Sequence, residues 1–260
     1  MVGLLEAALL GCLQGVTEWL PVSSSGHLAL AQKMLGLRVP LAFDVALHAG
    51  TMLAVLAFFR KDILKMVSAA VRLDYRSEYG SMGLMVVLGT APVALAGLLL
   101  HDAIGAIFES TLGIGVAMML MGTVLWLTRF FDGSRGIGAW DALFVGAAQA
   151  LALVPGISRS GITIAAGLSR RIDRRKAFLF SFMLSIPAVA GANVLEIYRA
   201  GSDLGAIGAE ALVGVAAAAA VGYASIGLLR NVFQSNRMHL FAYYCWAVGA
   251  AAVAYSYLFA

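Results

Sequence analysis

Charge is scarce in this chain. Only 12% of its 260 residues are Asp, Glu, Lys or Arg, whereas 61% are hydrophobic; soluble domains carry about 25% charged and about 45 to 50% apolar residues. The mean hydropathy is +0.89. This composition excludes a soluble globular domain and predicts an all-α polytopic membrane protein, a single integral membrane domain over residues 1–260.

Cysteine is also scarce, and no basic stretch precedes the first apolar segment. Cys12 and Cys245 lie far apart, so no disulfide framework is predicted, and no Cys or His cluster has zinc-ligand spacing. Because the first segment lacks a signal-peptide pattern, we expect it to stay in the mature chain. We interpret the net charge of +4 as a report of membrane topology rather than of a nucleic-acid partner.

Six apolar segments approach the ~20 residues that a spanning helix needs: 41–59, 83–100, 111–128, 177–197, 209–229 and 239–259. Four others are too short to cross alone: 3–20, 25–36, 140–154 and 159–170. A break rich in Pro, Ser and Gly interrupts each short pair, PVSSSG at 21–26 and PGISRSG at 155–161. We therefore expect two re-entrant pairs of half-helices and six full spans.

The order of these segments repeats along the chain. Two half-helices and three spans make up repeat one, about 1–130, and the same order fills repeat two, about 140–260. Sliding the chain by 135 residues aligns identical residues: Gly11, Gln14, Ser23, Ser25, Gly26 and Ala31 with Gly146, Gln149, Ser158, Ser160, Gly161 and Ala166. The pattern predicts an internal duplication.

The predicted repeats have opposite orientations in the membrane. If each re-entrant pair enters and leaves the membrane on the same side, each repeat crosses the membrane three times. The second repeat then begins on the opposite face from the first. On this topology one side receives fourteen Lys and Arg and the other only Lys33, Arg38 and Arg199, with Arg159 set aside as a residue at depth. The positive-inside rule makes the richer side cytoplasmic and places both termini outside.

Inverted repeats with broken helices meet near the midplane, where transporters build their binding sites. Each half-helix that follows a break directs free backbone N–H groups and a positive dipole end there, which favours an anion site in a polar cavity. Ser23, Ser24, Ser25, Ser158, Ser160 and Thr163 supply hydroxyls, Gly26, Gly156 and Gly161 permit close approach, and Arg159 supplies a fork for phosphate oxygens. The alternative for each serine is close helix packing.

Glu18 and His27 flank the three serines on the first tip. Glu18 is either a structural partner of Arg159 or a base or cation ligand beside a phosphate; we favour the second, since a base, hydroxyls, an imidazole and an arginine suit phosphoryl transfer. Gln14 shares the helical face of Glu18 and either coordinates a cation or hydrogen-bonds to Glu18. Asp44 and His48 form a further polar pair, either supporting this site or joining two helices.

The motifs QGVTEWLPVSSSGH and PGISRSGIT resemble those of the undecaprenyl-diphosphate phosphatases, the bacitracin resistance family. The resemblance implies catalytic roles for Glu18, Ser24, His27 and Arg159, and diphosphate binding by Ser23, Ser25, Gly26, Ser158, Ser160 and Thr163. It also implies a divalent cation, Mg²⁺ or Ca²⁺, near Glu18 and Gln14. This chain has Gln14 where the family often has Glu, so a neutral amide stands where the family often has a carboxylate that could bind a cation through both oxygens.

The reaction that the resemblance implies is hydrolysis of undecaprenyl diphosphate to undecaprenyl phosphate and inorganic phosphate, which recycles the lipid carrier of peptidoglycan and other cell-wall polymers in the bacterial inner membrane. Either Ser24 is the nucleophile, with His27 or Glu18 as its base, or Glu18 activates a water. The competing function is a transporter or flippase for an anionic lipid. The sequence leaves the oligomeric state open, with a homodimer as one expectation.

Overall fold

The computed structural model describes residues 2–108, 110–200 and 208–258, and in these ranges the backbone is almost entirely helical, without a β-strand. Six helices have the length and apolar composition of membrane spans: α3 (Leu41–Phe58), α5 (Glu78–Phe108), α6 (Thr111–Leu127), α9 (Arg174–Ala200), α10 (Ala209–Gln234) and α11 (Phe241–Leu258). They match the six predicted segments, and the fold is that of an all-α multi-pass membrane protein.

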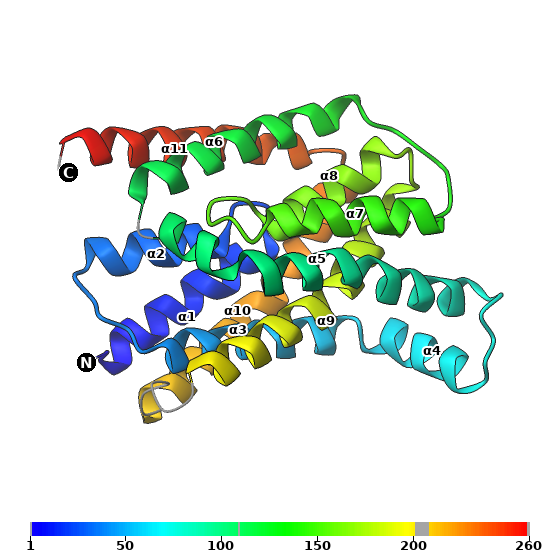
Figure 1. Cartoon of the computed structure of the whole chain (residues 1–260), viewed down its shortest axis with the longest axis horizontal. Coiled ribbons are helices and arrows are strands. Elements are labelled where there is room, and N and C mark those ends of the chain that lie inside the picture. Colours follow the sequence, from blue (N-terminus) through cyan, green and yellow to red (C-terminus); the bar gives the residue numbers. More distant parts are fainter. Residues whose placement is uncertain (1, 109, 201–207, 259–260) are drawn as a thin grey trace.

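The four short segments form two hairpins, α1 (Leu4–Trp19) with α2 (Ser24–Met34) and α7 (Ala139–Leu151) with α8 (Arg159–Ser169). The hairpins enter the molecule from opposite ends, and their bends lie near its middle (Figure 1). We call residues 20–27 the first tip and residues 155–161 the second tip. Each break contains a proline, Pro21 or Pro155, which has no N–H to continue a helix.

A serine restarts the helix after each break. Ser23 Oγ accepts a hydrogen bond from the backbone N–H of Gly26, and Ser158 Oγ accepts one from Gly161. These are N-caps at equivalent positions of the 135-residue offset. Ser24 and Arg159 thus become the first residues of their half-helices, where backbone N–H groups have no partner within the helix.

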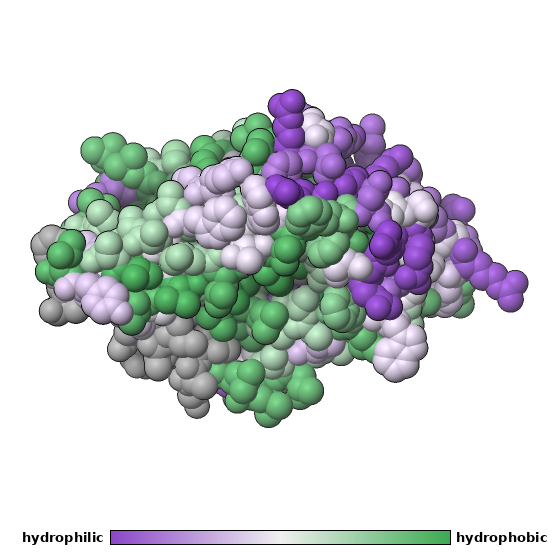
Figure 2. All heavy atoms as spheres, turned by 90° about the horizontal axis from the view of Figure 1, so that it is seen from above, coloured by the Kyte–Doolittle hydropathy of each residue, from purple (hydrophilic) through white to green (hydrophobic). Residues whose placement is uncertain are grey.

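Hydrophilic side chains gather at one end of the molecule, on the right in Figure 2. Because that view is turned about the horizontal axis, the same end lies on the right in Figure 1. This basic end contains α4 (Arg60–Val71), a helix that the sequence analysis did not predict, and the exposed side chains of Arg72, Arg76 and Arg135. Both described chain ends lie at the opposite end (Figure 1). The uneven distribution of charge inferred from the sequence is therefore also seen in the structure.

Glycines let the long helices approach closely. A Cβ on Gly15 of α1 would lie 2.8 Å from the backbone nitrogen of Gly222 in α10, and one on Gly115 of α6 would lie 2.8 Å from the carbonyl oxygen of Gly249 in α11. Gly115 and Gly249 are separated by nearly the predicted repeat offset and face one another. That contact is what a two-fold axis between the repeats would produce, although the inverted relation itself stays a prediction.

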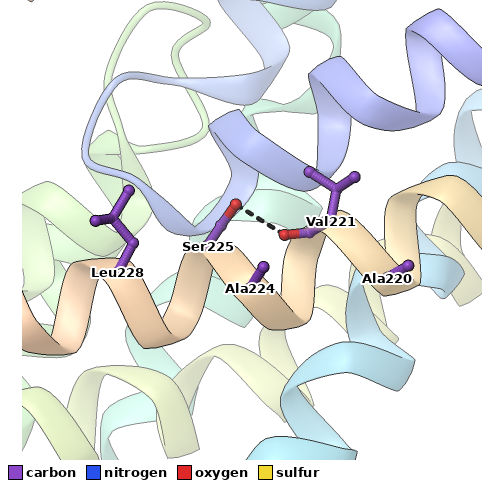
Figure 3. Close-up of a pocket in the computed structure, with 5 residues that line it drawn as sticks. All are labelled: Ala220, Val221, Ala224, Ser225 and Leu228. Carbon is purple, nitrogen blue, oxygen red and sulfur yellow. Dashed lines mark hydrogen bonds between the residues drawn. The ribbon is translucent and has the colours of Figure 1, made fainter.

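Apolar side chains fill the interior and cover the middle of the surface. Trp19 stacks on Phe182 with ring centroids 5.3 Å apart, next to Phe59 and Phe178. On α10 a groove of about 450 Å³ is lined by Ala220, Val221, Ala224, Ser225 and Leu228 (Figure 3). The Ser225 hydroxyl donates to the Val221 carbonyl at 2.9 Å, so this groove presents hydrocarbon and no free donor, as a lipid-facing surface should.

Candidate active site

The two tips are in direct contact. Gly156 of the second tip donates its backbone N–H to Ser23 Oγ at 3.0 Å, and a Cβ on Gly26 would lie 3.3 Å from the same nitrogen. Residues 133 positions apart in the sequence are thereby joined. The prediction that the two breaks meet is confirmed by this geometry.

Glu18, at the end of α1, is the centre of the polar cluster between the tips. Its side chain is 6% exposed. Arg159 Nη2 donates to Oε1, while Oε2 accepts from Ser24 Oγ at 2.5 Å and from Gln14 Nε2 at 3.1 Å. A carboxylate can be buried only when charge and hydrogen bonds compensate its lost hydration, and here both are supplied.

Arg159 occupies the first position of α8, and its side chain is 14% exposed. Its guanidinium also lies 5.1 Å from the centre of the Trp19 ring, within the range of a cation–π contact. Both Trp19 and Glu18 come from the end of α1. The arginine is therefore oriented by the first hairpin although it belongs to the second.

Ser24 and Glu18 form the pairing that nucleophilic catalysis requires. The hydroxyl of Ser24 donates its proton to a carboxylate oxygen, which can accept that proton when the serine oxygen attacks an electrophile. Ser24 and Ser25 are half-buried, in contrast to the buried Ser23. The first two hydroxyls of α2 thus stay accessible.

His27 is held away from Ser24. Its Nδ1 lies 2.7 Å from the carbonyl oxygen of Ser23, and its Nε2 lies 2.7 Å from the hydroxyl of Tyr244. No hydrogen bond in the described ranges joins His27 to Ser24. Of the two bases considered from sequence, the geometry favours Glu18.

The hydroxyls on and after the second tip are engaged in packing. Ser158 and Ser160, both buried, point to the carbonyl oxygen of Leu20 at 3.5 and 3.4 Å. Thr163 donates to the Arg159 carbonyl at 2.8 Å and lies 2.6 Å from Ser181 Oγ. The two serine contacts join the tips, as the packing alternative expects, whereas Thr163 joins α8 to α9. Diphosphate binding by these three residues stays a prediction.

Gln14 has an unused acceptor. Its Oε1 is buried and has no hydrogen-bond partner within the described part of the chain, while its Nε2 bonds to Glu18. No group of three or more His, Cys, Asp or Glu side chains suited to a metal occurs among the described residues. An amide oxygen beside one carboxylate fits Mg²⁺, which commonly takes one or two protein ligands and completes its shell with phosphate oxygens and water.

His48 of α3 is a neighbour whose role the sequence left open. Its Nε2 lies 3.9 Å from Glu18 Oε2, and its Nδ1 lies 2.9 Å from the carbonyl oxygen of Asp44. Asp44 accepts a hydrogen bond from Gln32 of α2 at 2.9 Å. The pair thus supports the site and also joins two helices. Tyr244 was missed altogether, because nothing in the pattern of α11 distinguishes it from the tyrosines around it.

Comparison with known proteins agrees with this geometry. The model of the family "Bacitracin resistance protein BacA" matches residues 7–251. Three relatives carry the name undecaprenyl-diphosphatase: those of Desulforapulum autotrophicum (38% identical, covering 96% of this chain and 97% of the relative), Desulfosudis oleivorans (41%, 94% and 96%) and Trichlorobacter lovleyi (42%, 96% and 96%). With both motifs at the meeting point of the tips and a match over nearly its whole length, this chain belongs to the BacA family.

Proposed function

We propose that this protein is an undecaprenyl-diphosphate phosphatase, which hydrolyses the diphosphate of a polyprenyl lipid and releases inorganic phosphate. The observation that supports this most strongly is the geometry of Glu18, whose one oxygen accepts the Ser24 proton while the other is bound by Arg159. A transporter needs a cationic clamp but has no use for a serine paired with a base.

In the first step, Ser24 Oγ attacks the terminal phosphorus and passes its proton to Glu18. The bond between that phosphorus and the bridging oxygen breaks, and undecaprenyl phosphate leaves with the bridging oxygen. Arg159 and the free N–H groups at the start of α2 stabilise the charge on the phosphoryl oxygens. Arg159 can exchange Glu18 for the diphosphate, because a guanidinium binds the paired anionic oxygens of a carboxylate and of a phosphate in the same bidentate way.

In the second step, a water attacks the phosphorus of the phosphoserine and the bond from phosphorus to Ser24 Oγ breaks. Glu18 returns its proton to Oγ, and orthophosphate leaves with the oxygen and the hydrogens of the water. The rival mechanism has Glu18 activate a water that attacks the diphosphate directly. Phosphate trapped on Ser24 after acid quenching would support the first mechanism, whereas rapid turnover by Ser24→Ala would support the second.

A divalent cation, Mg²⁺ or Ca²⁺, is proposed at Gln14 Oε1 and Glu18, with the remaining ligands from the diphosphate and water. When bound it would neutralise phosphate charge. The orphaned acceptor of Gln14 is the structural reason for this assignment.

We further propose that the protein resides in the bacterial inner membrane with both termini outside and the basic end in the cytoplasm. Its two repeats are related by inversion, and the site opens outward, since the first tip enters from the end that holds the termini. There it would recycle the carrier lipid for peptidoglycan and other cell-wall polymers and confer bacitracin resistance. A homodimer stays an expectation, which light scattering of the purified protein would test.

The decisive experiment measures inorganic phosphate released from undecaprenyl diphosphate by purified protein in detergent, with and without Mg²⁺ or Ca²⁺. We expect cation-dependent release that is lost in Arg159→Ala. Movement of substrate across vesicles without phosphate release would support a transporter or flippase instead.

A further inference from the structure

The last helix of the chain supports the first tip. Two consecutive residues of α11 contact it: the Tyr244 hydroxyl lies 2.7 Å from His27 Nε2, and Cys245 Sγ lies 3.5 Å from the Pro21 carbonyl oxygen. The His27 and Tyr244 rings also stack, with centroids 5.6 Å apart and an interplanar angle of 11°. Residues 217 positions apart are thus paired by a hydrogen bond between two nearly parallel rings.

The direction of the hydrogen bonds follows from the partners. A carbonyl oxygen can only accept, so the Nδ1 of His27, which lies against the Ser23 carbonyl, carries the proton. In the neutral ring Nε2 is then an acceptor, and the Tyr244 hydroxyl is its donor. The Ser23 carbonyl therefore selects the tautomer of His27, and the Tyr244 hydroxyl, bonded at Nε2, holds the ring in place.

His27 in turn holds the residue before the nucleophile. Ser23 has φ of +72°, a left-handed conformation that is costly for any residue other than glycine. Its carbonyl oxygen accepts from both the backbone N–H of His27 at 3.2 Å and the ring Nδ1–H at 2.7 Å. This conformation turns the chain so that Ser24, the next residue, reaches Glu18.

We propose that Tyr244 is a positioning residue for the phosphatase reaction. Through His27 it keeps Ser23 in its strained conformation and so keeps Ser24 Oγ against the carboxylate of Glu18. This inference rests on the proposed function. It gives repeat two a second contribution to the site, since Arg159 comes from α8 and Tyr244 comes from α11.

The test compares Tyr244→Phe with Tyr243→Phe. Phenylalanine keeps the ring and removes only the hydroxyl, while Tyr243 is exposed and packs its ring on Trp126 and Trp246. We expect Tyr244→Phe to lower kcat about tenfold, the loss of one well-formed hydrogen bond, with KM changed by less than about twofold. Tyr243→Phe should retain the parent's kcat.

A structural role alone would not give the same results in two further measurements. Because Tyr244 acts only through His27, the double variant His27→Ala, Tyr244→Phe should be no slower than His27→Ala; an additional tenfold loss would overturn the proposal. In the ¹⁵N spectrum of the His27 ring, Tyr244→Phe should shift Nε2, and an unchanged Nε2 signal would also overturn it. That spectrum needs no turnover, so failure of this inference is distinct from failure of the phosphatase assignment, which the parent's phosphate release decides.

Discussion

Replacing Glu18 by glutamine removes two functions of that carboxylate, and each loss is read in a different measurement. The substitution keeps the size and planarity of the side chain but removes the charge that pairs with Arg159 and the basicity needed to take the Ser24 proton. Loss of the base should lower kcat about a thousandfold, within the range of general-base catalysis. The assay is phosphate release from undecaprenyl diphosphate at saturating substrate and cation.

The same substitution should destabilise the protein. The Arg159 side chain, 14% exposed, would remain charged without a partner, which costs about 3 kcal/mol for a buried pair and corresponds to a Tm lowered by roughly 10 °C. Removing both charges in Glu18→Gln, Arg159→Gln should restore most of the lost stability, because a neutral pair is tolerated. It should restore no activity.

A matched control is available on the same helix. Glu6 accepts a hydrogen bond from the backbone N–H of Gly3 at 2.6 Å and lies at the far end of α1, so Glu6→Gln should retain full activity. The reasoning would be refuted if Glu18→Gln kept more than about a tenth of the parent kcat, far above the loss of a general base. It would equally be refuted if the double variant were less stable than the single one.

Three further predictions concern other contacts. Ser24→Ala should show no trapped phosphate after acid quenching and lose about a thousandfold in kcat, because it removes the nucleophile; trapped phosphate in this variant would exclude Ser24 as the attacking group. Arg159→Lys should lower kcat/KM about a hundredfold because lysine keeps the charge but lacks the fork that binds two oxygens; parent-like kcat/KM would mean that charge alone suffices. Burial raises the pKa of Asp141, but hydrogen bonds from Arg170 and the Gly138 amide, with the charge of Arg135, hold it below its ordinary value. The ionised Asp141 therefore stabilises the fold at pH values above the ordinary pKa of an aspartate. This stabilisation is lost as the pH falls through the lowered pKa of Asp141 in the folded protein. Asp141→Asn should lower the Tm in detergent by roughly 5 °C at pH 7, and the difference should shrink as the pH falls below 3.8, the ordinary Asp value; a pH-independent difference would contradict this account.

The helices were predictable because the membrane imposes a simple rule on the chain. A span needs a long apolar run, and a Pro, Ser and Gly break ends one, so both half-helix pairs and all six spans could be placed from the pattern. The α4 helix escaped detection since it is short, amphipathic and outside the apolar runs. Its apolar residues, such as Leu64 and Val67, are exposed and alternate with charged residues. The segment therefore contains no long apolar run that would reveal it.

The sequence predicted which residues belong to the candidate site, but not how their side chains are arranged. Glu18 and Arg159 stood out because a charge at membrane depth needs a partner or a function, and the structure brings them together. Their surroundings were not predictable. Ser158 and Ser160 have the same residue type as Ser23 and Ser25, yet they contact the Leu20 carbonyl, because the direction of a hydroxyl depends on which backbone groups the opposite tip leaves unpaired.

By itself the sequence determined that this protein lies in a membrane, where its helices break, and which polar groups are at the breaks. These properties follow from local composition and from the cost of unpaired polar groups in hydrocarbon. Only the tertiary structure decided that Ser24 bonds to Glu18 and that His27 turns to Tyr244. Hydrogen bonds depend on distances of a few tenths of an ångström between atoms on different helices, and helix packing alone sets those distances.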